Sequence, residues 1–186
     1  MGKSATTALL RERQVQVVDT DILARELVQP GQPALAEIRR VFGEEMVGPD
    51  GNLRRGALAG RVFADSEARQ KLENILHPRI RDEWKGQVNQ WRSEGRDCAV
   101  VVIPLLFETK AEEEFDSTIC VACSAGTQRK RLSERGWSVP EVEQRIGAQL
   151  PVEQKISASD FVIWTEGDMG THARQLDRIL AAIQVR

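Results

Sequence analysis

Long hydrophobic runs are missing from this 186-residue sequence. No apolar run approaches the roughly 20 residues that a membrane-spanning helix needs. No charged and apolar leader with a cleavage site is evident near residue 1 either. We therefore expect no membrane segment, no membrane partner and a cytoplasmic location.

Cysteine is also scarce, and neither positive nor negative charge is in large excess. Cys98, Cys120 and Cys123 form no even disulfide framework, and Cys120 and Cys123 lack a second pair of metal ligands nearby. A formal net charge of -2 argues against a broad surface for nucleic acid, although it is compatible with a local basic patch for a phosphorylated small molecule. The 41% hydrophobic and 29% charged content is that of a globular protein with one sizeable core.

Short apolar runs rich in β-branched residues alternate with helical patterns. They are residues 14–18 (QVQVV), 99–103 (AVVVI), 118–122 (TICVA) and 161–164 (FVIW). The runs are mostly continuous, as in strands buried on both faces of a parallel sheet. The sequence therefore predicts an α/β fold with a parallel sheet and flanking helices.

A long helical stretch without a strand separates the first two runs. Apolar residues at steps of three and four form two stripes: Leu35, Ile38, Val41 and Phe42, and then Leu72, Ile75, Leu76, Ile80, Trp84, Val88 and Trp91. Asp65 is placed to cap the second helix, and Pro78 is expected to kink or interrupt it. Residues 30–95 are therefore interpreted as an inserted helical lobe.

Residues 129–150 have the composition of a basic lid over the sheet edge. They contain five arginines or lysines. Ser138 and Glu141 form an S-x-x-E capping box with Pro140 in the first turn, which predicts a short helix that ends before Pro151.

Gly2, Lys3 and Ser4 match the end of the phosphate-binding loop G-x-x-x-x-G-K-[ST]. This tripeptide alone recurs by chance, and a solvated lysine would explain Lys3 equally well. A predicted helix over residues 5–13 follows at once, however. Lys3 would then lie at a helix N-terminus, where backbone N–H groups and the helix dipole favour phosphate.

Asp19 and Asp21 follow the first predicted strand, where ligands bind in open parallel sheets. A carboxylate there can orient and deprotonate an attacking hydroxyl, while Lys3 and a magnesium ion on Ser4 spread the charge of the phosphoryl group. This is the layout of a phosphotransferase. For Asp19, the favoured explanation is a structural role as helix N-cap. For Asp21, a role as helix cap and a role as the base that deprotonates the hydroxyl are equally open.

Five strings in order then resemble the signatures of the dephospho-coenzyme A kinase family. They are VVDTDILARELVQPG, LHPRI, IPLLFE, RLSERGWSVPEVEQRIGAQLP and SASDFVI. The resemblance implies a P-loop NTPase-like parallel sheet with an inserted helical substrate lobe and a small lid. It also implies transfer of a phosphoryl group from ATP to the ribose 3′-hydroxyl of dephospho-coenzyme A, giving coenzyme A and ADP. The implied division is a nucleotide-binding core (1–30, 97–128 and 151–186), an acceptor lobe (31–96) and a lid (129–150).

The resemblance also implies roles for individual residues. Asp21 would be the general base, and Lys3 the second catalytic residue. Ser4 would bind magnesium. The implied ATP-binding residues are Met1, Gly2, Lys3, Ser4, Ala5, Arg135 and Arg145, and the implied acceptor-binding residues are Asp21, Arg25, His77 and Pro78. For His77, an N-cap or a packed histidine before proline is an equally open explanation.

The sequence departs from the family pattern in three places. Val102 stands where many relatives carry an acidic residue, so a further magnesium carboxylate would come from Asp19, Asp21 or Glu108. Residues 164–167 (WTEG) replace the D-N-x-G of the adenine pocket. The first strand and the start of the phosphate loop are missing, and we hypothesise that Met1 is an internal residue of that loop.

Two alternatives remain open at this stage. A kinase for another hydroxyl acceptor would share the phosphate loop but should lack the H-P-x-I and P-L-L-x-E strings. A truncated, catalytically impaired relative would bind the coenzyme A precursor without turning over ATP.

Overall fold

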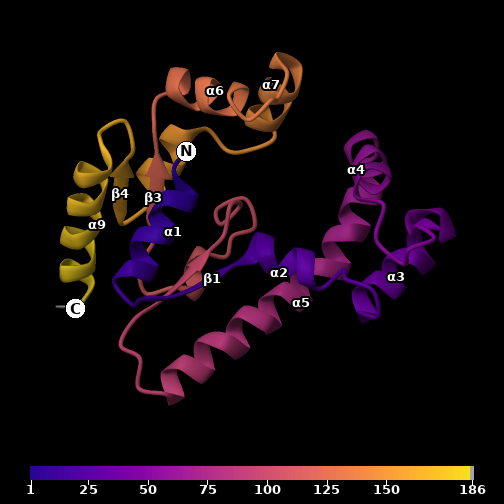
Figure 1. The fold of residues 1–186 in the computed structure, drawn as a ribbon, viewed down its shortest axis with the longest axis horizontal. Coiled ribbons are helices and arrows are strands. Elements are labelled where there is room, and N and C mark those ends of the chain that lie inside the picture. Colours follow the sequence, from indigo (N-terminus) through magenta and orange to yellow (C-terminus); the bar gives the residue numbers. More distant parts are fainter. Residues whose placement is uncertain (185–186) are drawn as a thin grey trace. The chain divides into compact units, whose positions relative to one another are not determined.

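A computed structural model describes residues 1–184 and shows a mixed α/β chain (Figure 1). The helices are α1 (Lys3–Glu12), α2 (Thr20–Glu26), α3 (Pro33–Phe42), α4 (Arg55–Ala64), α5 (Ser66–Ser93), α6 (Ala125–Ser133), α7 (Val139–Gly147), α8 (Val152–Ala158) and α9 (Met169–Gln184). The strands are β1 (Gln16–Asp19), β2 (Ala99–Val102), β3 (Ile119–Ala122) and β4 (Phe161–Trp164). Two short 3₁₀ helices are η1 (Glu44–Met46) and η2 (Glu112–Glu114). Each predicted strand is present, and helix α1 lies where it was expected.

The chain divides into two compact units. Unit 1 contains Met1–Val17 and Pro104–Arg186, and unit 2 contains Val18–Ile103. The boundary falls within β1, which pairs with β2. The finer division into a core, an acceptor lobe and a lid stays a prediction. None of the helices within residues 1–184 has both the length and the apolar character needed to cross a membrane.

In unit 1, β3 and β4 pair in parallel, from Ile119 opposite Phe161 to Ala122 opposite Trp164. This confirms the predicted parallel pairing. Helix α9 packs against α1 and β4, and α8 packs against β3. Burial on both faces is incomplete, however, because Trp164 is exposed at the end of β4. Its indole N–H donates to a carboxylate oxygen of Glu166 (3.2 Å), so the polar edge of this exposed ring has a hydrogen-bond partner.

A buried ion pair ties two distant segments of unit 1 together. Nζ of Lys155, a buried residue of α8, lies 2.7 Å from Oε1 of Glu108. The same Glu108 oxygen accepts from the Leu150 backbone N–H (2.9 Å). Burial by itself would raise the pKa of Glu108, but hydrogen bonds from Lys155 and Leu150 outweigh burial and hold this pKa below its usual value. The IPLLFE string therefore anchors the chain just before α8.

Unit 2 has a helical core. Its buried cluster comes from the segment after α2 and from α3, η1, α4 and α5: Val28, Ala34, Ile38, Phe42, Met46, Leu58, Ala68 and Ile75. The first predicted stripe is confirmed at Leu35, Ile38 and Phe42, but it is wrong at Val41, which is 37% exposed. Val41 lies about 100° around the helix from Phe42, at the edge of the apolar face.

Helix α5 begins at the predicted cap and continues through its proline. The Asp65 carboxylate accepts from the backbone N–H groups of Glu67 (2.8 Å) and Ala68 (3.2 Å). Pro78 does not interrupt the helix. The Arg79 guanidinium donates to the Ile75 carbonyl (2.5 Å) and to Glu37 of α3 (2.6 Å). The bond to Glu37 fixes α5 against α3.

The cap of α5 gives a stability test. Asp65→Ala should lower the free energy of unfolding by about 1 kcal/mol, since two N–H groups of the first turn lose their acceptor. Asp65→Asn is the matched control and should retain most of the stability, because asparagine caps equally well. Chemical denaturation of the three proteins measures the difference. Equal losses in both variants would show that the carboxylate does not act as a cap.

Candidate functional site

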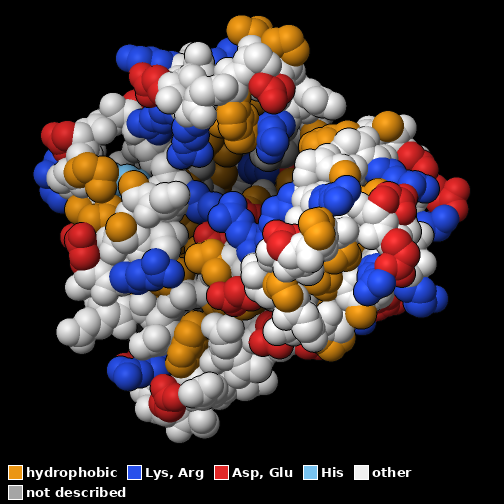
Figure 2. All heavy atoms as spheres, turned by 45° about the vertical axis from the view of Figure 1, so that its right-hand side comes forward, with side chains coloured by type: hydrophobic (Ala, Val, Ile, Leu, Met, Phe, Trp, Pro, Cys, Tyr) orange, Lys and Arg blue, Asp and Glu red, His pale blue; other side chains and the backbone are white. Residues whose placement is uncertain are grey.

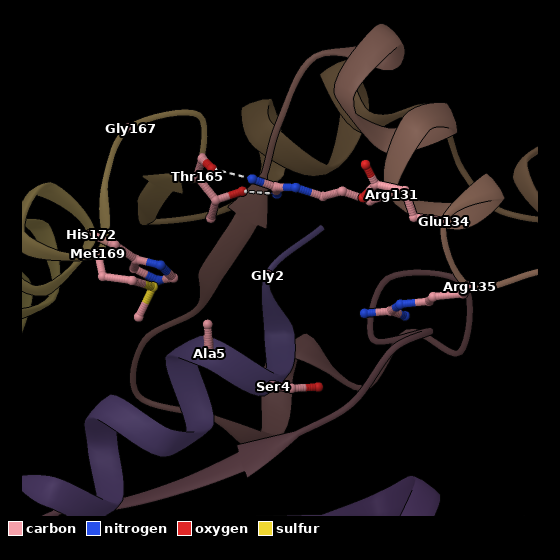
Figure 3. A pocket seen from close by; sticks show the side chains of 10 residues that line it. All are labelled: Gly2, Ser4, Ala5, Arg131, Glu134, Arg135, Thr165, Gly167, Met169 and His172. Atoms are coloured by element: carbon pink, nitrogen blue, oxygen red, sulfur yellow. Dashed lines mark hydrogen bonds between the residues drawn. The ribbon is translucent and has the colours of Figure 1, made fainter.

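A pocket of about 420 Å³ lies beside the first turn of α1 in unit 1 (Figure 3). Its lining comes from the start of the chain, from α6 and the residues after it, and from the segment between β4 and α9. The lining residues are Gly2, Ser4, Ala5, Arg131, Glu134, Arg135, Thr165, Gly167, Met169 and His172. Residues more than 160 positions apart in sequence therefore share one cavity.

The floor of the pocket is the N-terminus of a helix. Gly2 caps α1 with a left-handed φ of 105°, and its carbonyl accepts from the Thr6 backbone N–H (3.0 Å). A Cβ at Gly2 would lie 2.8 Å from Cγ2 of Thr165. Glycine is therefore required by both the backbone angle and the space. The first N–H groups of a helix lack partners within it and point toward bound anions.

Thr165 joins the elements around the pocket. Its buried hydroxyl lies 3.0 Å from the Met1 carbonyl oxygen and 3.1 Å from that of Ala122 in β3. The Arg131 guanidinium of α6 donates to the Thr165 hydroxyl (2.8 Å) and to the Thr165 carbonyl (2.6 Å). Because two different nitrogens of Arg131 bind the same residue, the plane of the guanidinium is held in one orientation.

A second polar contact joins α9 to α1. Nε2 of the buried His172 lies 2.9 Å from Oγ1 of Thr6. Oγ1 of Thr6 also lies 3.2 Å from the Gly2 carbonyl. Burial and then the positive charge of Arg131 lower the pKa of His172 below its usual value. The imidazole is therefore neutral at physiological pH.

Arg135 forms a cationic side of the pocket. Figure 3 shows Arg135 extending toward the pocket from the side opposite His172 and Met169. Within residues 1–184, the Arg135 side chain makes no hydrogen bond or ion pair. Arg145 does not line the pocket, because its guanidinium lies 4.1 Å from the centre of the Trp137 ring. A free guanidinium at a helix N-terminus is suited to a phosphate group.

Comparison with known proteins identifies relatives of the whole chain. A family model described as dephospho-CoA kinase matches residues 1–170. The chain is 44% identical over 184 residues to a dephospho-CoA kinase of Anaeromyxobacter dehalogenans, covering 98% of this chain and 87% of that protein. It is 40% identical over 179 residues to one of Bdellovibrio bacteriovorus, covering 96% of this chain and 89% of that protein. The chain belongs to the dephospho-CoA kinase family.

Solved structures agree in fold. A crystal structure of a Thermus thermophilus protein superposes with a TM-score of 0.83 at 33% identity, covering 98% of this chain and 92% of the other. A dephospho-CoA kinase from Campylobacter jejuni superposes with a TM-score of 0.71 at 24% identity over the same shares of the two chains. The P-loop NTPase-like α/β fold implied by the sequence is confirmed.

The structure of this dephospho-CoA kinase family member brings some of the predicted ATP residues together and leaves others apart. Gly2, Ser4, Ala5 and Arg135 line the pocket. The other three predicted ATP residues, Met1, Lys3 and Arg145, are not among the lining residues. Lys3 is the first residue of α1, the Met1 carbonyl accepts from the Thr165 hydroxyl, and Arg145 stacks on Trp137. Their roles stay predictions.

The predicted acceptor residues all lie in unit 2. Asp21 and Arg25 are one turn apart on α2, and His77 and Pro78 lie within α5, against which α2 packs. Asp19 is the N-cap of α2 and accepts from the Asp21 backbone N–H (2.9 Å), which confirms its structural explanation. His77 is exposed in the middle of α5, so it is neither an N-cap nor a packed core residue.

The residues present are compatible with magnesium at Ser4. The Ser4 side chain is exposed at the pocket, and within residues 1–184 its hydroxyl has no hydrogen-bond partner. No group of three or more potential metal ligands gathers among the described residues. Of the further carboxylates considered, Asp19 caps α2 and Glu108 pairs with Lys155. Oxygens of bound phosphates would complete the coordination shell, as magnesium commonly requires.

Four lining residues had no place in the sequence analysis: Arg131, Glu134, Met169 and His172. Thr165 and Gly167 were considered only as part of the string that replaces the adenine-pocket pattern. A signal for Arg131 was available, because it is the first arginine of the same R-L-x-x-R string that led to Arg135. No signal pointed to His172, since its contact with Thr6 joins residues 166 positions apart. Thr165 lies in the WTEG segment, which departs from the family pattern.

Glu166 of the same segment fixes the start of α6. Its carboxylate accepts from the Ser124 backbone N–H (3.0 Å), and Ser124 is the N-cap of the helix. Hydrogen bonds from Ser124 and Thr127 lower the pKa of Glu166 to about 2. The carboxylate therefore helps to position the helix that carries Arg131.

The first prediction from the pocket concerns Gly2. Gly2→Ala should destabilise the protein and weaken ATP binding, because a left-handed φ costs a non-glycine residue about 1 to 2 kcal/mol and the new Cβ contacts Thr165. Gly60→Ala is the control, since its Cβ would meet nothing within 4 Å on α4. Thermal unfolding with and without ATP measures both effects. A Gly2→Ala protein with the wild-type melting temperature and ATP response would contradict this account.

A second prediction concerns pH. The pKa of Glu166 is lower in the folded protein, about 2, than its ordinary value of 4.5. The carboxylate therefore stabilises the fold above about pH 4.5, and this contribution is lost as the pH falls toward 2. The stability gap between wild type and Glu166→Gln should be widest at neutral pH and narrow across that interval. A gap that does not change with pH would contradict the assignment.

Proposed function

We propose that this protein phosphorylates dephospho-coenzyme A with ATP, the final step of coenzyme A synthesis, and that it does so in the cytoplasm. The observation that carries the proposal is the pocket at the start of α1, in a chain of the dephospho-CoA kinase family. It combines helix N–H groups, an exposed hydroxyl and a guanidinium without a partner among the described residues. Together these groups suit a nucleotide polyphosphate.

On the donor side, the first turn of α1 and Arg135 would hold the phosphates of ATP. Lys3 would add a positive charge at the phosphoryl group that is transferred. Ser4 would hold a magnesium ion, which supplies further neutralisation of the phosphate charge. We also propose that residues 129–150 act as the lid, with Arg145 as its second phosphate-binding arginine.

On the acceptor side, Asp21 would accept the proton of the ribose 3′-hydroxyl. The 3′-oxygen then forms a bond to the γ-phosphorus, and the bond from that phosphorus to the bridging oxygen of ADP breaks. Arg25 lies one turn further along α2 on the same helix face, where it can bind a phosphate of the acceptor. His77 and Pro78 would contribute to the acceptor site within residues 31–96.

The two alternatives are separable by one assay. ADP release is measured with ATP alone, with dephospho-coenzyme A, and with other small hydroxyl compounds. Release that depends on dephospho-coenzyme A supports the proposal. Release that depends on another acceptor identifies a different kinase, and binding of dephospho-coenzyme A without ADP release identifies a catalytically impaired relative.

The general base gives the sharpest mutational test. Asp21→Asn should retain the fold and ATP binding but reduce turnover by about 10²- to 10⁴-fold, the usual effect of removing a general base. Asp19→Asn is the matched control, because asparagine preserves the N-cap of α2 and should cost far less. Steady-state kinetics and ATP titration measure both properties. Equal losses at the two positions, or full activity in Asp21→Asn, would exclude Asp21 as the base.

A further inference from the structure

The pocket has two chemically different sides. Arg135 and the exposed Ser4 hydroxyl provide polar groups without protein partners among the described residues, which suit phosphate. The side formed by α9 instead offers the Met169 thioether and the His172 imidazole, and Figure 3 shows both extending from α9. Arg131 adds a fixed plane, because Thr165 occupies two of its nitrogens. A guanidinium plane and a thioether are favourable surfaces for an aromatic base.

The hydrogen bonds of Thr6 define the tautomer of His172. The Thr6 hydroxyl has one proton, and it lies 3.2 Å from the Gly2 carbonyl four residues earlier, which is the i−4 hydrogen bond that threonine commonly donates in a helix. Having used its only proton, the hydroxyl oxygen accepts from Nε2 of His172 (2.9 Å). Nε2 therefore carries the proton of the neutral ring, and Nδ1 carries a lone pair.

Nδ1 of His172 is available to a ligand. Within residues 1–184 it has no hydrogen-bond partner, and the side chain lines the pocket. The lowered pKa of His172 means that the lone pair persists at neutral pH. The pocket thus presents a fixed hydrogen-bond acceptor on the side suited to a base.

We infer that His172 is a specificity-determining residue for the nucleotide, with Nδ1 accepting a hydrogen bond from the 6-amino group of a purine. This inference rests on the proposed function. Adenine carries an N–H donor at this position, whereas guanine carries a carbonyl oxygen whose lone pairs would face that of Nδ1. The pocket therefore selects ATP over GTP through α9 and not through the phosphate loop.

The test compares three nucleotides by calorimetry in the absence of acceptor: ATP, purine riboside triphosphate, in which hydrogen replaces the 6-amino group, and GTP. Wild type should bind ATP roughly three- to tenfold more tightly than purine riboside triphosphate, the effect of one neutral hydrogen bond, and GTP more weakly than either. His172→Leu removes both ring nitrogens. His172→Gln retains an N–H donor for Thr6 but has no acceptor at the position of Nδ1. Because it keeps the contact with Thr6, it should fold even where His172→Leu does not.

In both variants, ATP and purine riboside triphosphate should bind equally. Arg174→Ala, on the exposed side of α9, is the control and should retain the wild-type ratio. Equal binding of ATP and purine riboside triphosphate by wild type, or a wild-type ratio in folded His172 variants, overturns the inference and leaves the proposed function standing. Failure of wild type to bind any of the three nucleotides overturns both.

Discussion

The pocket depends on the buried hydroxyl group of Thr165. It lies within hydrogen-bonding distance of the Met1 and Ala122 carbonyl oxygens and accepts from Arg131. One side chain thereby links the start of the chain, β3 and α6 at a single point. The methyl group of the same residue leaves no room for a Cβ at Gly2. The position of α1 relative to the sheet of unit 1 and the backbone angle of Gly2 are thus consequences of the same packing.

The arginines of residues 129–145 carry the same charge but have different partners. Arg129 pairs with Glu143 and joins α6 to α7, Arg131 is held by Thr165, and Arg145 stacks on Trp137. Figure 2 shows that Lys and Arg side chains are interspersed with Asp and Glu side chains on the visible surface. Arg135 alone of these four lines the pocket without a hydrogen bond or ion pair within the described residues. A count of basic residues predicts a cationic segment, but only the contacts decide which guanidinium is available to a phosphate.

Two strings that carry the family resemblance also maintain the fold. Glu108 of IPLLFE binds Lys155 and the Leu150 N–H, and Arg79 of LHPRI bridges Ile75 and Glu37 beside the proline of α5. Charged residues in these motifs are therefore not all substrate ligands. The buried Glu108–Lys155 pair would be costly to break on one side alone, because the remaining charge would lose its partner in a poorly solvated site.

The sequence alone determined the local structure and the family. Apolar periodicity located the four strands and the helical layer, Asp65 and the Ser138–Glu141 box marked helix starts, and five motifs indicated the kinase family. These features depend on residues a few positions apart, where spacing and geometry are closely related. The predicted burial of Val41 was wrong because it lies at the edge of the apolar face of α3, and Pro78 lies inside the continuous helix α5. Only the tertiary structure decided that Thr165 and His172 meet the start of α1 and that Thr165 holds Arg131, because those contacts join residues whose proximity no local pattern encodes.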